Sequence, residues 1–196
     1  MWATDPKLLL FTLSRHKFVA KMLQGYHSIL EVECGDGFAS RLIQPCVGHL
    51  SSIDFDPSFI DEAKLHSKAD WNVDYHVHNI LEAPFLKASN KFDAAFSLDV
   101  FEHIPSSLSD TYATNVKKSI SRDGVFICGC PSLESQVYAS EESKQGHVNC
   151  MNGVDLRHYF LRYFKHVFLF SMNDEVLHTG FSPMAHYNFV ICTSSL

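Results

Sequence analysis

Two glycines and one aspartate give this sequence its clearest chemical signal. Gly35 and Gly37 follow the buried-strand pattern Ser-Ile-Leu-Glu-Val at 28–32, and Asp54 ends a second apolar run about twenty residues later. Glycine has no Cβ, so a ligand can lie against the main chain at the turn. A carboxylate at the end of the second strand can accept hydrogen bonds from both hydroxyls of a ribose. The pattern therefore predicts a site for a nucleoside-containing cofactor.

Two features of the sequence disfavour a nicotinamide dinucleotide. The pattern Gly-x-Gly-x-x-Gly would need a third glycine where Ser40 stands. A short-chain reductase would also need a Tyr-x-x-x-Lys pair to deliver a proton, and none of the seven tyrosines has a lysine four residues later. The choice among other nucleoside cofactors stays open at this point.

The elements that must position these residues alternate along the chain. One helix is expected near the N-terminus, where Asp5 can cap its start and Gly25 can end it. Further helices are expected over 38–44, 58–67 and 155–164. Strands are expected over 28–33, 49–55, 72–78, 91–99, 125–130, 167–170 and 187–192. The last two lack a crossover helix between them and should pair antiparallel. The sequence thus predicts an α/β fold, a doubly wound and mostly parallel sheet covered on both faces.

Composition limits the classes of protein that fit. With 196 residues, 46% of them hydrophobic, the chain suits one domain over 1–196. The net charge of −6 and the lack of basic runs argue against nucleic acid and anionic membranes as partners and favour a small-molecule substrate. The apolar stretch 8–13 is too short for a signal core or a membrane span. Six cysteines without Cys-x-x-Cys indicate reduced thiols and a cytoplasmic location.

Three motifs together resemble a known family. Leu-Glu-Val-Glu-Cys-Gly-Asp-Gly at 30–37, Ile-Asp-Phe-Asp-Pro at 53–57 and Phe-Asp-Ala-Ala-Phe-Ser-Leu-Asp-Val-Phe-Glu-His-Ile-Pro at 92–105 resemble the class I S-adenosylmethionine-dependent methyltransferases. The segments 122–127 and 146–149 extend the resemblance toward the C-terminus. It implies a seven-stranded sheet with the last strand antiparallel, S-adenosyl-L-methionine as the cofactor, and methyl transfer as the activity.

The resemblance also implies which residues hold the cofactor. The methionine portion is expected to contact Glu31, Glu33, Cys34, Gly35, Gly37 and Leu98, and the ribose is expected to contact Asp54. The adenine is expected beside Phe55, Asn79 and Ile80, and the sulfonium above Asp99 and Phe101. Glu33 departs from the family, which usually has a glycine there. Because an unpaired buried carboxylate is costly, we expect the Glu33 side chain to be solvated or partnered.

Two histidines are candidate catalytic bases, since a hydroxyl acceptor is a poor nucleophile until its proton is leaving. His103 follows the fourth strand, and His147 lies in the polar segment 131–150, which with 171–186 is expected to flank the active site. His103 has an alternative role, in which it bonds to the backbone and fixes its loop. No metal site is predicted. His76 and His78 share a strand face without a third ligand, and Glu102 beside His103 suggests a metal-assisted sugar or RNA methyltransferase only if further ligands cluster there.

The sequence thus predicts a methyltransferase that O-methylates a sugar or a related hydroxylated intermediate. An N- or C-methyltransferase of a small aromatic or quinone-type precursor is the first alternative. The second alternative is a binding module that has lost turnover through Glu33. The oligomeric state does not follow from the sequence.

Overall fold

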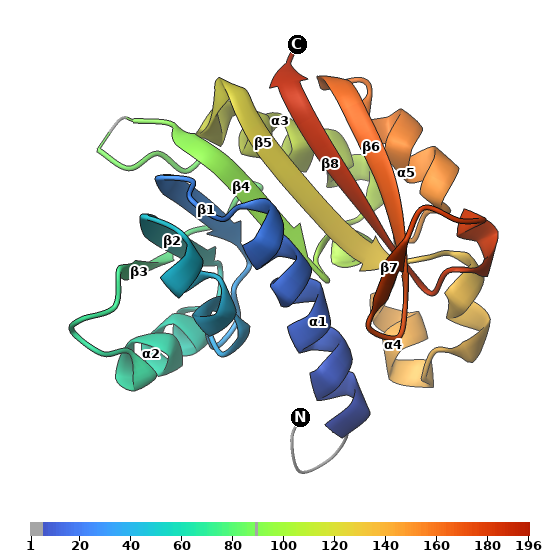
Figure 1. Cartoon of the computed structure of the whole chain (residues 1–196), viewed down its shortest axis with the longest axis horizontal. Helices are drawn as coiled ribbons and strands as arrows, with labels where there is room; N and C mark the ends of the chain where they lie inside the picture. Colours follow the sequence, from blue (N-terminus) through green and yellow to red (C-terminus); the bar gives the residue numbers. More distant parts are fainter. Residues whose placement is uncertain (1–5, 89) are drawn as a thin grey trace.

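The fold is built on one eight-stranded sheet (Figure 1). The computed structural model describes residues 6–88 and 90–196. The strands are β1 (Ser28–Val32), β2 (His49–Asp54), β3 (Val73–Val77), β4 (Phe92–Leu98), β5 (Ile120–Pro131), β6 (Phe164–Asn173), β7 (Val176–His178) and β8 (Tyr187–Ser195). Their order is β3-β2-β1-β4-β5-β8-β6-β7. The pairs among β1 to β5 are parallel, and β8 runs antiparallel to both β5 and β6.

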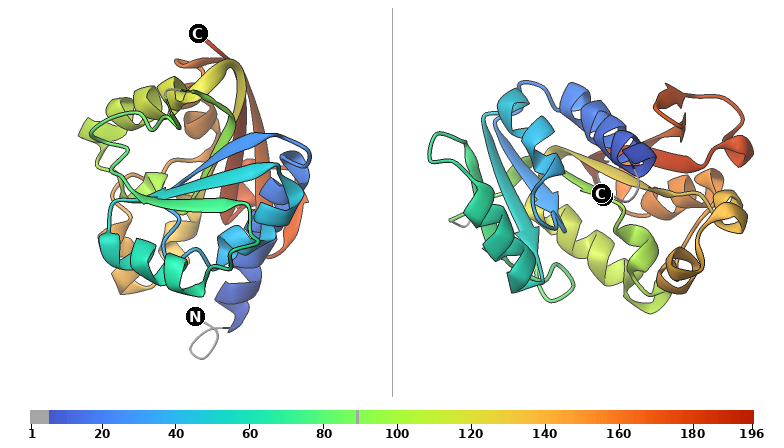
Figure 2. Two further views of the ribbon diagram at one scale, coloured as in Figure 1. Left: turned by 90° about the vertical axis from the view of Figure 1, so that its left-hand side faces the viewer. Right: turned by 90° about the horizontal axis from the view of Figure 1, so that it is seen from below.

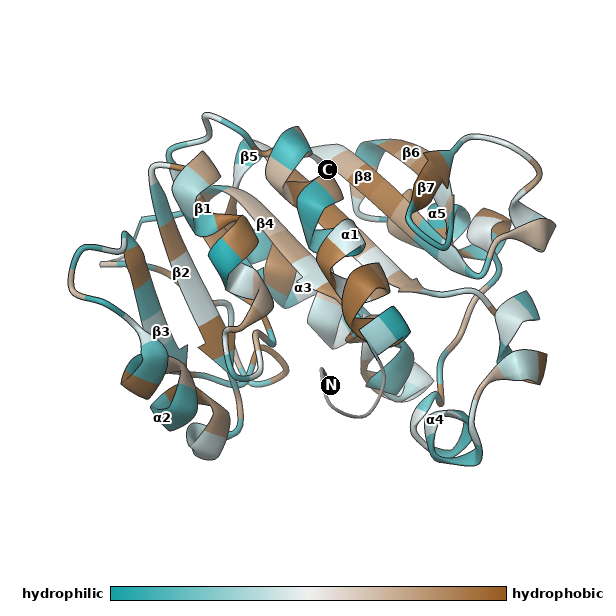
Figure 3. Ribbon diagram, turned by 60° about the horizontal axis from the view of Figure 1, so that its bottom comes forward, coloured by the Kyte–Doolittle hydropathy of each residue, from teal (hydrophilic) through white to brown (hydrophobic). Residues whose placement is uncertain are grey.

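Helices cover both faces of this sheet (Figure 2). The helices α1 (Pro6–Met22) and α2 (Pro57–His66) pack on one face, and α3 (Ser109–Ser119) and α5 (Gly153–Phe160) pack on the other. In β1, Leu30 and Val32 face the α3 side while Ile29 faces α1, and all three are buried. Burial on both faces is the reason that the strand reads as a continuous apolar run. The largely hydrophobic β8 contrasts with the hydrophilic α4 (Glu141–Gly146) in Figure 3.

The predicted mostly parallel α/β fold is confirmed, but the sheet has eight strands where seven were expected. The additional strand, β7, pairs antiparallel with the end of β6. Asp174 adopts a φ of 51° in the turn between them, so the chain reverses tightly and forms a hairpin inside the segment 171–186. The rest of that segment holds the 3-10 turn η6 (Ser182–Met184).

The helix expected after the glycine turn is wrong in type. Two 3-10 turns replace it, η1 (Ala39–Leu42) and η2 (Gln44–Cys46). Pro45 has no N–H to donate and ends the segment, and so short a helix is only marginally stable. Helix α2 begins at Pro57, one residue before the expected start, and the Asp56 carboxylate caps it by accepting from Ser58 N at 2.8 Å.

Other boundaries bear on the site. The segment 131–150 contains η5 (Glu134–Tyr138) and α4, and the residues after β4 form η3 (Phe101–His103) and η4 (Ser106–Leu108). The expected cap residue Asp5 lies outside the described residues. All six cysteines are free thiols. Within the described part of the chain, no helix has both the length and the apolar character that crossing a bilayer requires.

Candidate functional site

Two neighbouring cavities lie at the carboxyl ends of the parallel strands. The first, of about 480 Å³, lies between α1 and the turn after β1, and we call it the α1 cavity. The second, of about 460 Å³, extends along the ends of β2 and β3 to His103, and we call it the His103 cavity. Both are bordered by Glu33, Gly35 and Asp99, so they meet at the glycine turn. This edge of a parallel sheet is where α/β proteins bind their ligands.

The two glycines of the turn serve different purposes. Gly35 has a φ of +57°, and a Cβ placed on it would meet nothing within 4 Å, so its bare main chain faces the cavities. Gly37 has a φ of +70°, and a Cβ there would lie 2.8 Å from the ring and hydroxyl of Tyr75. Gly35 therefore leaves room for a ligand, whereas Gly37 is required by packing.

Asp54 lines the His103 cavity, where a ribose was expected. Its Oδ2 accepts a hydrogen bond from Gly35 N at 2.9 Å, and its Oδ1 accepts one from Asp56 N at 2.9 Å. The residue is only 4% exposed. Asp54 consequently ties the end of β2 to the glycine turn, a structural role that the sequence motif alone does not indicate.

Glu31 and Glu33 bring two carboxyl groups to the same turn. Glu31 is buried, and its Oε2 accepts from the Ser52 hydroxyl at 2.6 Å. Glu33 has a φ of 59° and is half-buried, and its Oε2 accepts a long 3.4 Å hydrogen bond from Phe55 N. Burial raises the pKa of each to about 7, and the charge of Asp54 contributes at Glu33.

Glu33→Gln is expected to remove a pH dependence of stability. The folded pKa of about 7 lies above the ordinary value of 4.5, so the folded state binds this proton more tightly than the unfolded state does. Stability is therefore lost as the pH rises from 4.5 to 7. Relative to the variant, the wild type should lose on the order of 2 kcal/mol over that window. Denaturant unfolding of both proteins from pH 4.5 to 8 measures this, and parallel curves would contradict it.

The expected adenine residues also line the His103 cavity. Phe55 is 63% exposed and Ile80 is buried, and they offer two apolar surfaces for a ring. The Asn79 Oδ1 accepts from Leu81 N at 3.0 Å, and its Nδ2 donates to Glu82 at 3.1 Å. The Asn79 oxygen keeps a second lone pair that can accept from a ligand.

Two of the remaining predicted residues line the α1 cavity. Leu98 and Cys34 border it, although Cys34 N already donates to Ile53 O at 3.0 Å. Phe101 borders neither cavity. The η3 turn directs its side chain into the core, where it is fully buried with its ring 5.5 Å from that of Phe160. The expectation that Phe101 lies beneath a sulfonium is therefore not supported by its position.

Arg15 is a site residue that the motifs did not reveal. Its Nη1 donates to both carboxylate oxygens of Asp99, at 2.8 and 3.0 Å, and its guanidinium lies 3.9 Å from the ring centroid of Tyr187. Asp99 is held there with a φ of 57°. This pair fastens α1 across the junction of the two cavities. Only the polar position of Arg15 on an amphipathic helix could have suggested it.

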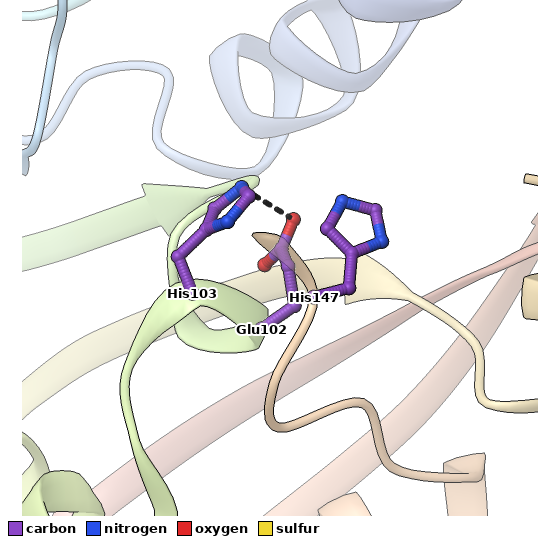
Figure 4. Close-up of side chains that lie close together, drawn as sticks. All are labelled: Glu102, His103 and His147. Carbon is purple, nitrogen blue, oxygen red and sulfur yellow. Dashed lines mark ion pairs between the residues drawn. The ribbon is translucent and has the colours of Figure 1, made fainter. Parts of the chain in front are cut away.

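The structure brings both predicted histidines together. His103 lines the His103 cavity, and its ring centroid lies 5.0 Å from that of His147 (Figure 4). The Nδ1 of His103 bonds to Gly146 O at 3.0 Å, and the Nδ1 of His147 bonds to Gln136 Oε1 at 2.7 Å. The His103 contact with Gly146 O also fits its alternative role of fixing a loop. Glu102 lies between the two rings.

The strand order and the site at the strand ends define a Rossmann-like methyltransferase fold, and solved structures agree. The methyltransferase domain of bacterial CtHen1-C superimposes with a TM-score of 0.76 at 13% identity, covering 95% of this chain and 100% of that one. The N-methyltransferase NodS from Bradyrhizobium japonicum gives a TM-score of 0.69 at 14% identity, covering 97% and 98%. At such identities, the likeness concerns the fold.

Residues 29–124 match the family described as "Methyltransferase domain". This match confirms the resemblance to the class I S-adenosylmethionine-dependent methyltransferases. It is 30% identical over 82 residues to the ubiquinone biosynthesis O-methyltransferase of Xanthomonas campestris, covering 41% of this chain and 34% of the relative. The enzyme of the same name from Cereibacter sphaeroides is 28% identical over 112 residues, covering 57% and 44%. The matched segments thus span one third to less than half of these relatives.

Proposed function

We propose that this protein binds S-adenosylmethionine across the two cavities and transfers its methyl group to the oxygen of a small hydroxylated acceptor. The junction of the cavities at the bare main chain of Gly35, with Asp54 on one side and the histidine pair at the far end, is the observation that carries the proposal. Sugars and related biosynthetic intermediates are the first class of acceptor to test.

The residues of the site fit the cofactor in chemical type. Asp54 offers acceptor oxygens to the ribose hydroxyls, and Ile80 and Phe55 offer apolar surface to the adenine. Glu31 and Glu33 stand near the expected position of the methionine ammonium. A cation bound there would lower the pKa of Glu33 from about 7 and favour its charged form. The bound cofactor supplies an electrophilic methyl group on a sulfonium.

A neutral histidine suits the deprotonation of a hydroxyl. Burial, and then the neighbouring His103, lower the pKa of His147 below 6.5, so its ring is unprotonated at neutral pH. An unprotonated imidazole can accept a proton, which is what a general base must do. The name of the curated relatives, O-methyltransferase, also supports an oxygen acceptor.

Two alternatives keep specific support. The relatives act in ubiquinone biosynthesis by name, which favours an aromatic or quinone-type acceptor over a sugar. Glu33, at the junction of the cavities with one long hydrogen bond, favours a module with weakened cofactor binding. Calorimetry with S-adenosylmethionine and with its demethylated product distinguishes the second alternative from an active enzyme. If the protein bound neither compound, the enzyme proposal would be wrong.

Labelled methyl transfer to a panel of sugars, sugar nucleotides, phenols and amines tests the acceptor. For a hydroxyl acceptor, we expect His147→Ala to lower turnover by about 10²- to 10⁴-fold while the cofactor affinity stays unchanged. His166→Ala, at an exposed position of β6, is the matched control and should leave turnover unaltered. An amine acceptor methylated equally well by wild type and His147→Ala would replace the oxygen assignment.

A further inference from the structure

Glu102 is a buried carboxylate without a hydrogen-bond partner. It is 1% exposed, and neither of its side-chain oxygens has a partner among residues 6–88 and 90–196. His103 Nε2 lies 3.9 Å from Oε1, which is beyond hydrogen-bond distance. Arg15 is already bonded to Asp99. A buried carboxylate that is left unpaired costs several kcal/mol, roughly, unless a cation or proton compensates it.

The two histidines next to Glu102 have their ring nitrogens arranged for metal binding. The Nδ1 of each ring lies against an oxygen that can only accept, Gly146 O for His103 and Gln136 Oε1 for His147. The Gln136 amide is oriented by its Nε2, which donates to Ser132 O at 3.1 Å. Each Nδ1 therefore carries the proton, and each Nε2 keeps a lone pair. Metal-binding histidines are usually oriented by such a hydrogen bond from their other nitrogen.

The three side chains converge on one point. One ligand atom from each of Glu102, His103 and His147 lies within 4.8 Å of the other two. Figure 4 shows the carboxylate of Glu102 directed between the two imidazole rings. Ligand atoms about 2 Å from a bound zinc lie about 3.3 Å apart, so a small approach of the half-exposed His103 ring completes the set.

The backbone holds these distant segments together. Asn149 N donates to Glu102 O at 3.0 Å, and the buried Asn149 side chain donates to Ser109 Oγ at 3.0 Å. A Cβ on Gly146 would lie 3.3 Å from His103 Nδ1, so this position favours a residue without a side chain. The segment after α4 is thereby fixed against the η3 turn, and the cluster does not depend on surface side chains meeting by chance.

We propose that Glu102, His103 and His147 bind a divalent transition-metal ion with an open coordination position toward the His103 cavity. Two imidazoles and one carboxylate are the protein ligands of many catalytic zinc and iron(II) sites. Magnesium and calcium prefer an all-oxygen set, so the site suits Zn²⁺, Mn²⁺, Fe²⁺ or Co²⁺ better.

This metal deepens the proposed function and rests on it for its role. An acceptor hydroxyl bound to the metal loses its proton to solvent more readily. The resulting oxygen forms a bond to the methyl carbon, and the electron pair of the broken carbon–sulfur bond stays on the sulfur as a thioether. The histidines then act as ligands, so metal dependence of turnover separates this role from that of a free histidine base.

Metal titration of the full chain tests the site without any acceptor. Chelator-treated protein is titrated with Co²⁺ and followed by its visible spectrum, and with Zn²⁺ by calorimetry. We expect one ion per chain, and at least about 100-fold weaker binding in Glu102→Gln and in His147→Ala. His166→Ala is the control and should bind like wild type. Unfolding curves for every variant show whether it is folded.

The outcomes distinguish the two proposals. Equal Zn²⁺ affinity in wild type and a folded Glu102→Gln or His147→Ala would overturn the metal site, as would binding by cysteine thiolates, which the Co²⁺ spectrum identifies. Calorimetry with S-adenosylmethionine on the same metal-free protein tests the proposed function independently. Cofactor binding without metal binding would support the proposed function and rule out the metal site. Metal binding without cofactor binding would support the metal site and rule out the proposed function.

Discussion

Gly37→Ala is expected to destabilise the protein by about 2 to 5 kcal/mol. A non-glycine residue at a φ of +70° costs roughly 1–2 kcal/mol in backbone strain. The new methyl group would also lie 2.8 Å from the buried Tyr75 ring, and overpacking of this kind costs roughly 1–3 kcal/mol. Because the turn borders both cavities, cofactor affinity should fall with stability. Denaturant unfolding and calorimetry with S-adenosylmethionine measure the two effects.

Gly25→Ala is the matched control. Gly25 has a φ of +84° just after α1, and a Cβ there would meet nothing within 4 Å. Only the backbone strain should remain, so we expect a loss of roughly 1–2 kcal/mol and no change in cofactor affinity. Equal losses of stability in the two variants would show that Tyr75 moves aside and that packing does not require glycine at position 37.

Asp54→Ala is expected to weaken S-adenosylmethionine binding by about 10- to 100-fold, which is roughly 1.4 to 2.8 kcal/mol. The variant loses charge-assisted hydrogen bonds to the ribose. It also frees Gly35 N and Asp56 N, so the glycine turn becomes less ordered and stability falls by roughly 1–3 kcal/mol. Calorimetry and unfolding of the same preparation separate the two losses.

Asp56→Ala serves as the control for Asp54. It removes the N-cap of α2 and should cost about 1 kcal/mol of stability. Its side chain borders neither cavity, so cofactor affinity should be preserved. An Asp54→Ala protein that binds the cofactor as tightly as Asp56→Ala does would show that the nucleoside lies elsewhere.

Sequence patterns predicted the first five strands because each is a local run of apolar residues, or of alternating apolar and polar residues, that ends at a turn. The Asp56 cap and the antiparallel pairing of β6 with β8 were likewise predictable, since both depend on residues close in sequence or on connection length. The eighth strand was missed because β7 has only three residues. The helix after the glycine turn was wrong in type because the segment that Pro45 ends is too short to be a stable α-helix by itself.

The candidate site, like the fold, could be predicted from the sequence only in part. The positions of Gly35, Asp54 and Leu98 at the cavities followed from motifs that are contiguous in sequence, and that of Ile80 from its place after the third strand. The inward turn of Phe101 did not, because the η3 turn and its packing against Phe160 decide which way that side chain points.

By itself, the sequence indicated the resemblance to a methyltransferase family and placed the glycine turn and Asp54 at one edge of the sheet, because strand, turn and acidic residue lie within short segments whose local geometry is fixed. Only the tertiary structure decided that Arg15 fastens α1 to Asp99 and that Glu102 faces His103 and His147. Those contacts join segments far apart in the chain. They form only when the packing of the sheet and the hydrogen bonds of Asn149 bring the segments together.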